Sequence, residues 1–220
     1  MSSDETRRAR RTPGCRPRRP GRLDPAGAEA IAGAPDPAEL ADAAHTTAQV
    51  LVHRGRASDD PDVVARLVTL VETEGMETIA ALWSGSPADS LPGVLWRLYA
   101  LRTWVRSDAR IVADRYRQGV SAAAVHDVVA GVAQLPSAAD VVQLVDQVLT
   151  GVYTRDLDVA LERAAAFCRV VATGTAFDAD HLDVVDSVGA DRATRSAASL
   201  LRTADELAGA ADLWRQGRLE

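Results

Sequence analysis

The 220-residue sequence predicts an all-α protein, a single compact multi-helix domain preceded by a disordered Arg/Pro-rich N-terminal tail. Apolar residues recur at the spacing of about 3.6 that marks one face of an amphipathic helix. No stretch of strand length alternates apolar and polar residues, and no Asn-Gly or Asp-Gly turn joins two β-branched runs. We therefore expect roughly nine or ten helices and no sheet.

The first 22 residues differ from the rest of the chain in charge. They hold eight arginines and two acids, a net charge of +6, whereas the remainder holds 17 arginines and 29 acids, a net charge of −12. The basic segment is rich in proline and glycine and has no apolar periodicity, so it cannot bury enough surface to offset its conformational entropy. We expect residues 1–37 to be disordered and residues 38–220 to form the helical domain.

Capping residues mark where the helices begin and end. Asp60–Pro61 is a cap followed by proline in the first turn, and Gly75 ends that helix. Ser137 and Asp140 form a capping box for the next clear example, which ends near Gly151. Further helices are predicted from Thr154 and at about 38–54, 76–84, 90–106, 108–118, 122–132, 179–188 and 191–215.

Composition limits the class of protein and its location. All 25 basic residues are arginine, a bias typical of a high-GC genome. The two cysteines, Cys15 and Cys168, lie far apart, which fits a reducing compartment better than a disulfide framework. No apolar segment follows the basic N-terminus, and no run of about 18 uncharged apolar residues occurs. We expect a cytoplasmic protein that does not enter a membrane.

The stretch LPGVLWRLYALRTWVR, residues 91–106, concentrates aromatic and basic side chains. Leucine and valine side chains form one face of this helix, and its rings extend the apolar surface most of the way round, as in the central helix of a bundle. The alternative is an exposed groove for a protein partner, because tryptophan, tyrosine and arginine dominate binding hot spots. The candidate partner-binding residues are Trp96, Arg97, Tyr99, Arg102, Trp104 and Arg106.

The segment SLPGVLWRLYALRTWVRSD, residues 90–108, resembles uncharacterised all-helical proteins of high-GC actinobacteria. The resemblance is limited to this segment and implies no activity.

Two further segments bear on metal binding. His126–Asp127 resembles the His-Asp doublet of the HD-domain metal-dependent phosphohydrolases, which implies a divalent metal, but no histidine lies between His53 and His126. In DADHLDVVD, Asp178 and other aspartates surround His181, which suits an oxygen and imidazole site. The alternative is that Asp178 caps a helix, where negative charge is favoured. We expect no metal and no cofactor.

The basic tail is a candidate nucleic-acid contact, because clustered guanidinium groups neutralise phosphates. Its alternatives are a solubilising tail or an upstream region included by choice of start codon. The arginines concerned are Arg7, Arg8, Arg10, Arg11, Arg16, Arg18, Arg19 and Arg22.

Three functions follow from these patterns. The first is a non-enzymatic helical interaction or regulatory module that binds a protein partner. The second is nucleic-acid association through the tail, and the third is an enzyme of the metal-dependent phosphohydrolase kind. The sequence favours the first, because it holds no Walker loop, no GxSxG elbow and no Cys-x-x-Cys pair.

Overall fold

The computed structural model describes residues 36–58, 60–124, 137–153, 157–182 and 186–219. Within these ranges every regular element is a helix and none is a strand, which confirms the predicted all-α class. The helices are α2 (Pro37–Ala57), α3 (Pro61–Val68), α4 (Leu70–Glu74), α5 (Met76–Trp83), α6 (Leu91–Ser107), α7 (Ala109–Ala124), α8 (Ala138–Val152), α9 (Leu157–Leu182) and α10 (Ser187–Arg215).

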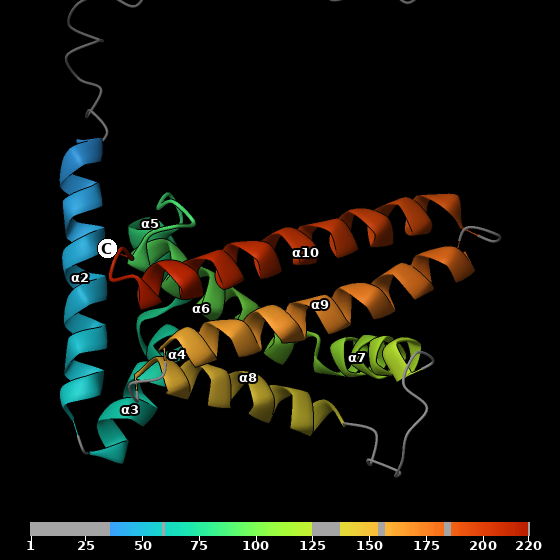
Figure 1. The fold of residues 1–220 in the computed structure, drawn as a ribbon, viewed down its shortest axis with the longest axis horizontal. Helices are drawn as coiled ribbons and strands as arrows, with labels where there is room; N and C mark the ends of the chain where they lie inside the picture. Colours follow the sequence, from blue (N-terminus) through green and yellow to red (C-terminus); the bar gives the residue numbers. More distant parts are fainter. Residues whose placement is uncertain (1–35, 59, 125–136, 154–156, 183–185, 220) are drawn as a thin grey trace, which may run out of the picture. The chain divides into compact units, whose positions relative to one another are not determined.

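The two longest helices, α9 and α10, run side by side as an antiparallel pair (Figure 1). Helices α7 and α8 both pack against α9, while α2 crosses the other end of the bundle (Figure 1). Helix α6 contacts α2, α5, α7, α8 and α10, so it lies between α2 and the helices that pack against α9. Helix α9 packs against α7, α8 and α10.

Helix α6 is the central helix that its apolar composition predicts. Ser90 caps its first turn by accepting a hydrogen bond of 3.3 Å from the Gly93 amide. Pro92 fits the same turn, because backbone amides in the first turn have no acceptor within the helix and proline has no amide hydrogen to donate. All the apolar positions assigned to its main face are buried: Leu91, Val94, Leu95, Leu98, Leu101 and Val105.

The predicted caps lie at the helix starts. Asp60 accepts a hydrogen bond of 2.9 Å from the Asp62 amide at the start of α3. Ser137 and Asp140 form the reciprocal capping box of α8, and these hydrogen bonds lower the pKa of Asp140. The first residues of both helices are therefore determined by local sequence.

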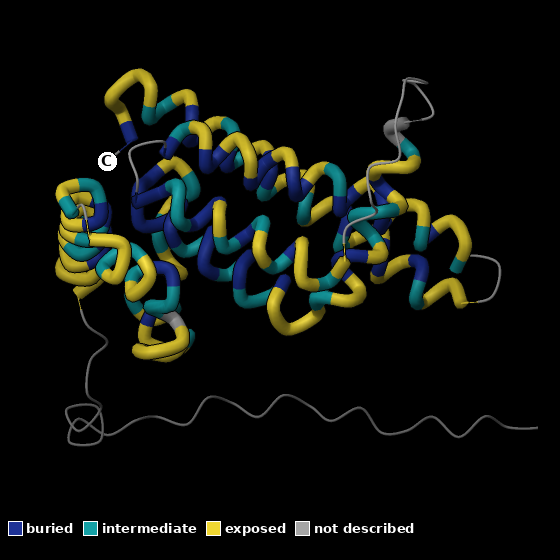
Figure 2. Tube along the Cα trace, turned by 90° about the horizontal axis from the view of Figure 1, so that it is seen from below, coloured by how far each residue is buried: buried dark blue, intermediate teal, exposed yellow. Residues whose placement is uncertain are grey.

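Aromatic side chains from separate helices form the middle of the core. Trp83 of α5 stacks on Tyr99 of α6 with a centroid distance of 6.0 Å, and its Nε1 donates a hydrogen bond of 3.2 Å to Thr47 of α2. Both rings are fully buried. Figure 2 shows that buried and exposed residues alternate along the long helices, so each helix presents one face to its neighbours.

The predicted helix at 179–188 is wrong. Helix α9 continues without a break to Leu182, so Asp178 lies inside the helix and is not its cap. Gly174 and Thr175, shortly before Asp178, are both buried within α9, and Gly174 meets the Arg115 backbone of α7 there. A glycine placed for close helix packing has the same sequence appearance as a helix stop.

The single helix predicted after Asp60 is divided into α3 and α4. The division falls at Thr69, whose hydroxyl donates to the carbonyls of Ala65 and Arg66. Such bonds from threonine to the preceding turn bend a helix. The helix predicted at 122–132 overlaps the end of α7, and its remaining residues lie outside the described ranges.

None of the helices in the described ranges combines the length and the apolar character that crossing a bilayer requires.

Candidate functional site

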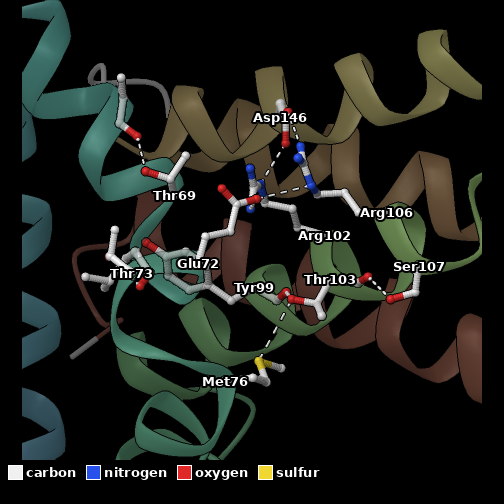
Figure 3. A network of polar contacts seen from close by, with 12 residues as sticks. Thr69, Glu72, Thr73, Met76, Tyr99, Arg102, Thr103, Arg106, Ser107 and Asp146 are labelled. Atoms are coloured by element: carbon white, nitrogen blue, oxygen red, sulfur yellow. Dashed lines mark hydrogen bonds and ion pairs between the residues drawn. The ribbon is translucent and has the colours of Figure 1, made fainter.

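Arg102 and Arg106 of α6 take part in an ionic cluster with two acids from other helices (Figure 3). Arg102 lies 2.7 Å from Asp146 of α8 and 3.1 Å from Glu72 of α4. Arg106 reaches the same carboxylates at 3.1 Å and 3.2 Å, respectively. The side chain of Arg102 is 3% exposed, whereas that of Arg106 is 42% exposed. The cluster therefore joins three helices, and Arg102 has almost no surface for a partner.

Arg97 joins α6 to α10. Its Nε lies 2.6 Å from the Glu206 carboxylate, and its Nη1 donates a hydrogen bond of 2.9 Å to the Gly93 carbonyl. The Arg97 guanidinium thus has an acidic partner on α10. The cation–π contact that the described residues do show is that of Arg56 over Trp214, 4.4 Å from the ring centroid.

The three aromatic candidates on α6 differ in exposure. Tyr99 is fully buried, whereas Trp96 and Trp104 are partly buried and pack against the core. Burial removes Tyr99 and Arg102 from the surface that a partner contacts. The proposed groove of six exposed side chains on this helix is therefore not present as a continuous surface.

The Tyr99 hydroxyl lies in a chain of hydrogen bonds. It donates to the Leu67 carbonyl at 2.5 Å and lies 2.6 Å from the Tyr153 hydroxyl. Burial raises the pKa of Tyr99 to about 12, although the Tyr153 hydrogen bond and the Arg102 charge oppose the shift. Burial also raises the pKa of Tyr153 well above its usual value, and Tyr99 reinforces that shift. Both groups keep their protons at neutral pH, as structural hydrogen-bonding groups do.

The metal-binding candidates do not assemble in the described part of the chain. The Asp178 carboxylate lies 3.3 Å from Nε of Arg115, so it already has a cationic partner. His181 is exposed one turn further along α9. Among the described residues, no three His, Cys, Asp or Glu side chains lie close enough to hold a metal ion.

Several sequence candidates lie outside the described ranges. They are His126 and Asp127 and the tail arginines Arg7, Arg8, Arg10, Arg11, Arg16, Arg18, Arg19 and Arg22.

Helices α7 and α9 cross unusually closely. A Cβ added at Gly119 would lie 2.0 Å from the Val170 carbonyl oxygen, and one added at Gly174 would lie 1.8 Å from that of Arg115. Each helix thus places a glycine against the backbone of the other. Because the earlier residue of α7 meets the later residue of α9, the two helices run antiparallel at the crossing.

A cleft of about 570 Å³ opens beside this crossing. A volume of this size falls in the range of roughly 300–1,000 Å³ that ligand sites occupy. Its walls combine an aromatic ring with polar side chains from both helices. The lining residues are Asp114, Arg117, Gln118, Ser121 and Ala122 of α7 and Phe177 and His181 of α9. We call this recess the α7–α9 cleft.

Phe177 gives the α7–α9 cleft its apolar wall. The ring is 44% exposed, although its neighbours Gly174, Thr175 and Ala179 are buried in the α9 interface. The side chain therefore lies off the buried face of its helix. A large exposed aromatic next to polar groups is the kind of side chain that anchors protein interfaces.

Arg117 provides the charged wall of the α7–α9 cleft. Its Nη2 forms an ion pair with Asp114 one turn earlier, and its Nε donates a hydrogen bond of 3.4 Å to the Ala113 carbonyl. Within the described residues, Nη1 donates no hydrogen bond. The guanidinium is thus held by its own helix and keeps donors for an occupant of the cleft.

Sequence reasoning identified only His181 of this cleft, and as a metal candidate. Phe177 carries the signal that could have revealed the site, because an aromatic residue off the buried stripe of a helix has to face solvent or a partner. Arg117 and Gln118 carry no such signal, since exposed polar residues are usual on any helix.

A second recess of about 460 Å³ lies between α2 and α10. The chain partly fills it, because Leu219 is buried against this region after α10 ends. Gly217, at φ +65°, allows the turn, with Gly217 donating to the Trp214 carbonyl and Arg218 to the Leu213 carbonyl, as in a Schellman motif. This recess is a packing feature of the C-terminal turn, so the α7–α9 cleft is the stronger candidate.

No protein-family model, curated protein or solved structure matches this chain.

Proposed function

We propose that this protein is a non-enzymatic interaction module that binds a protein partner in the α7–α9 cleft. The observation that supports the proposal is the exposed ring of Phe177 in a recess bordered by Arg117 and His181. Aromatic and arginine side chains contribute most of the binding energy at protein interfaces. A cytoplasmic partner is part of the same proposal, in keeping with the free thiol of Cys168.

The way the cleft is built also favours recognition of a partner over chemistry. Its charged groups are Arg117 and Asp114, which form an ion pair with each other, and the polar side chain of His181 lies on the exposed side of α9. Such groups suit the polar rim of an interface, where an apolar anchor is surrounded by hydrogen-bonding side chains.

Photo-crosslinking at the cleft tests this proposal. Phe177 is replaced by the photoreactive amino acid benzoylphenylalanine, which keeps an aromatic ring at the position. Val159 receives the same replacement as a matched control, because it is also 44% exposed and lies on the same helix. The two positions are 18 residues apart, which corresponds to about 27 Å along a helix. We expect a discrete adduct from position 177 and none of the same mass from position 159.

The captured protein is then purified and titrated against the unmodified domain and against Phe177→Ala. Loss of the ring should weaken binding by at least about tenfold, the usual effect of removing an interface anchor. The melting temperature should hardly change, since the ring is 44% exposed in the folded protein. Equal binding by Phe177→Ala, or identical adducts from both positions, would contradict the proposal.

A further inference from the structure

The α7–α9 cleft holds an arginine whose donors are only partly used. Arg117, Gln118 and Ser121 line its α7 side, and His181 lines its α9 side. The one carboxylate in the wall, Asp114, already accepts from Arg117. An occupant that supplies an acceptor would therefore bond Nη1 of Arg117, which donates no hydrogen bond within the described residues.

The polar residues of the α7 wall share one helix face. Asp114, which accepts from Arg117, and the donors Arg117 and Ser121 lie three and four residues apart along α7. On the facing helix, Phe177 and His181 lie four apart, which places the ring one turn before the imidazole. The cleft thus has an apolar contact and a set of donors within reach of a single short segment.

Charge opposes an acidic occupant less at this position than over the domain as a whole. Residues 23–220 carry a net charge of −12, so most of the surface repels anions. At the cleft, by contrast, Arg117 offsets Asp114, and Arg115 offsets the nearby Asp178. An arginine with free donors is the side chain best suited to bind a carboxylate.

We infer that the partner segment that occupies the α7–α9 cleft carries an apolar side chain next to a carboxylate. This inference rests on the proposed function, because it names the chemistry of the partner at the same site. The apolar side chain packs on Phe177, and the carboxylate accepts hydrogen bonds from Nη1 of Arg117 and from the neighbouring donors. A basic segment is disfavoured at the wall carboxylate, since Asp114 is already paired with Arg117.

Capped dipeptides test the inference without knowledge of the partner. Acetyl-Leu-Glu-amide and acetyl-Leu-Gln-amide have nearly the same shape and differ in charge, and sodium acetate supplies the carboxylate alone. Binding is followed by amide and side-chain nuclear magnetic resonance shifts of the whole chain. We expect the Glu dipeptide to shift the signals of Gln118 and Ser121 and to bind about tenfold more tightly than the Gln dipeptide, the advantage of a charged hydrogen bond.

Variants assign the selectivity to the arginine. Arg117→Gln alone would leave Asp114 unpaired, so the test variant combines it with Asp114→Asn and keeps the cleft neutral. This double variant should bind both dipeptides equally and weakly. Arg110→Gln is the control, because Arg110 is exposed on the same helix but does not line the cleft. It should keep the full preference for the Glu dipeptide.

Each remaining outcome has one meaning. Equal binding of the two dipeptides to the unmodified domain overturns the inference and leaves the crosslinking result untouched. If acetate binds as tightly as the Glu dipeptide, the part of the inference that concerns the apolar side chain is wrong. Unchanged binding of the Glu dipeptide by Phe177→Ala would contradict the same part. Shifts confined to residues outside the cleft overturn the inference altogether. If position 177 forms an adduct and any of these results is obtained, the proposed function stands and only the inference about the chemistry of the partner fails.

Discussion

Tyr153 donates its hydroxyl proton to Tyr99 across a distance of 2.6 Å. The direction follows from the next bond in the chain, because Tyr99 uses its own proton to bond the Leu67 carbonyl. A phenol has one proton, so Tyr99 can only accept from Tyr153. Three helical regions are thereby connected through two buried rings, and the two tyrosines have unequal roles.

The first prediction concerns this asymmetry. Tyr99→Phe leaves the buried Tyr153 donor without its acceptor, whereas Tyr153→Phe leaves Tyr99 still bonded to the Leu67 carbonyl. An unsatisfied buried donor destabilises a protein by about 1–3 kcal/mol. We expect Tyr99→Phe to lower the free energy of unfolding by about 2 kcal/mol and Tyr153→Phe by less than about 1 kcal/mol. Urea denaturation measures both, and equal losses would contradict the assigned direction.

The second prediction concerns alkaline pH. The pKa of Tyr99 is raised from 10.0 to about 12, so the folded state holds this proton more tightly than the unfolded state. The stabilisation is present below pH 10 and is lost as pH rises toward 12, by about 2 kcal/mol for this group. The Cys168 thiol, whose pKa burial raises from 9.0 to about 12, adds a loss of the same sign that begins at lower pH.

Urea titrations at a series of alkaline pH values check this dependence, with Tyr99→Phe as the comparison. The variant should lose less stability than the unmodified protein above about pH 10, because one of the linked protons is absent. Parallel curves for the two proteins would show that Tyr99 is not linked to folding in this range.

The third prediction separates the two arginines of the ionic cluster. Both contact Glu72 and Asp146, but only Arg102 is buried. Arg102→Gln should destabilise the protein by about 2–3 kcal/mol, because it breaks charged hydrogen bonds shielded from water. Arg106→Gln should cost less than about 1 kcal/mol, and that cost should shrink in high salt, as for an exposed pair. Thermal denaturation at two salt concentrations measures both effects, and a larger loss for Arg106→Gln would be inconsistent with the burial.

The fourth prediction concerns the crossing of α7 and α9. Gly119→Ala and Gly174→Ala each place a methyl group about 2 Å from a backbone carbonyl oxygen, so the helices must separate. We expect each change to lower the free energy of unfolding by more than about 3 kcal/mol. Gly209→Ala in α10 is the control, because no atom lies within 4 Å of the added Cβ. It should stabilise the protein by up to about 1 kcal/mol through helix propensity.

Much of the fold is local enough to predict from sequence. The caps at Asp60 and Ser137 act over three or four residues, and the apolar surface of α6 is a property of a single helix. The mistaken break near Asp178 shows the limit of this reasoning. Gly174 is required by the Arg115 backbone of another helix, and nothing within α9 itself distinguishes that use from a helix end.

The site was harder to predict for the same reason. Arg102 has the local sequence of a surface arginine, and its burial depends on acids 30 and 44 residues away. The α7–α9 cleft likewise requires that Arg117 and Phe177 meet across two helices. A periodic pattern shows which face of a helix is apolar, but it does not show which helix lies opposite.

The glycine contacts between α7 and α9 bear on how the cleft beside them behaves. At Gly119 and Gly174 backbone rests on backbone, so no side chain separates the two helices at these points. The spacing of the two helix backbones that carry the walls is therefore fixed before any molecule binds. Binding therefore does not require the two helices to move relative to each other, and molecules that would need them to move bind more weakly.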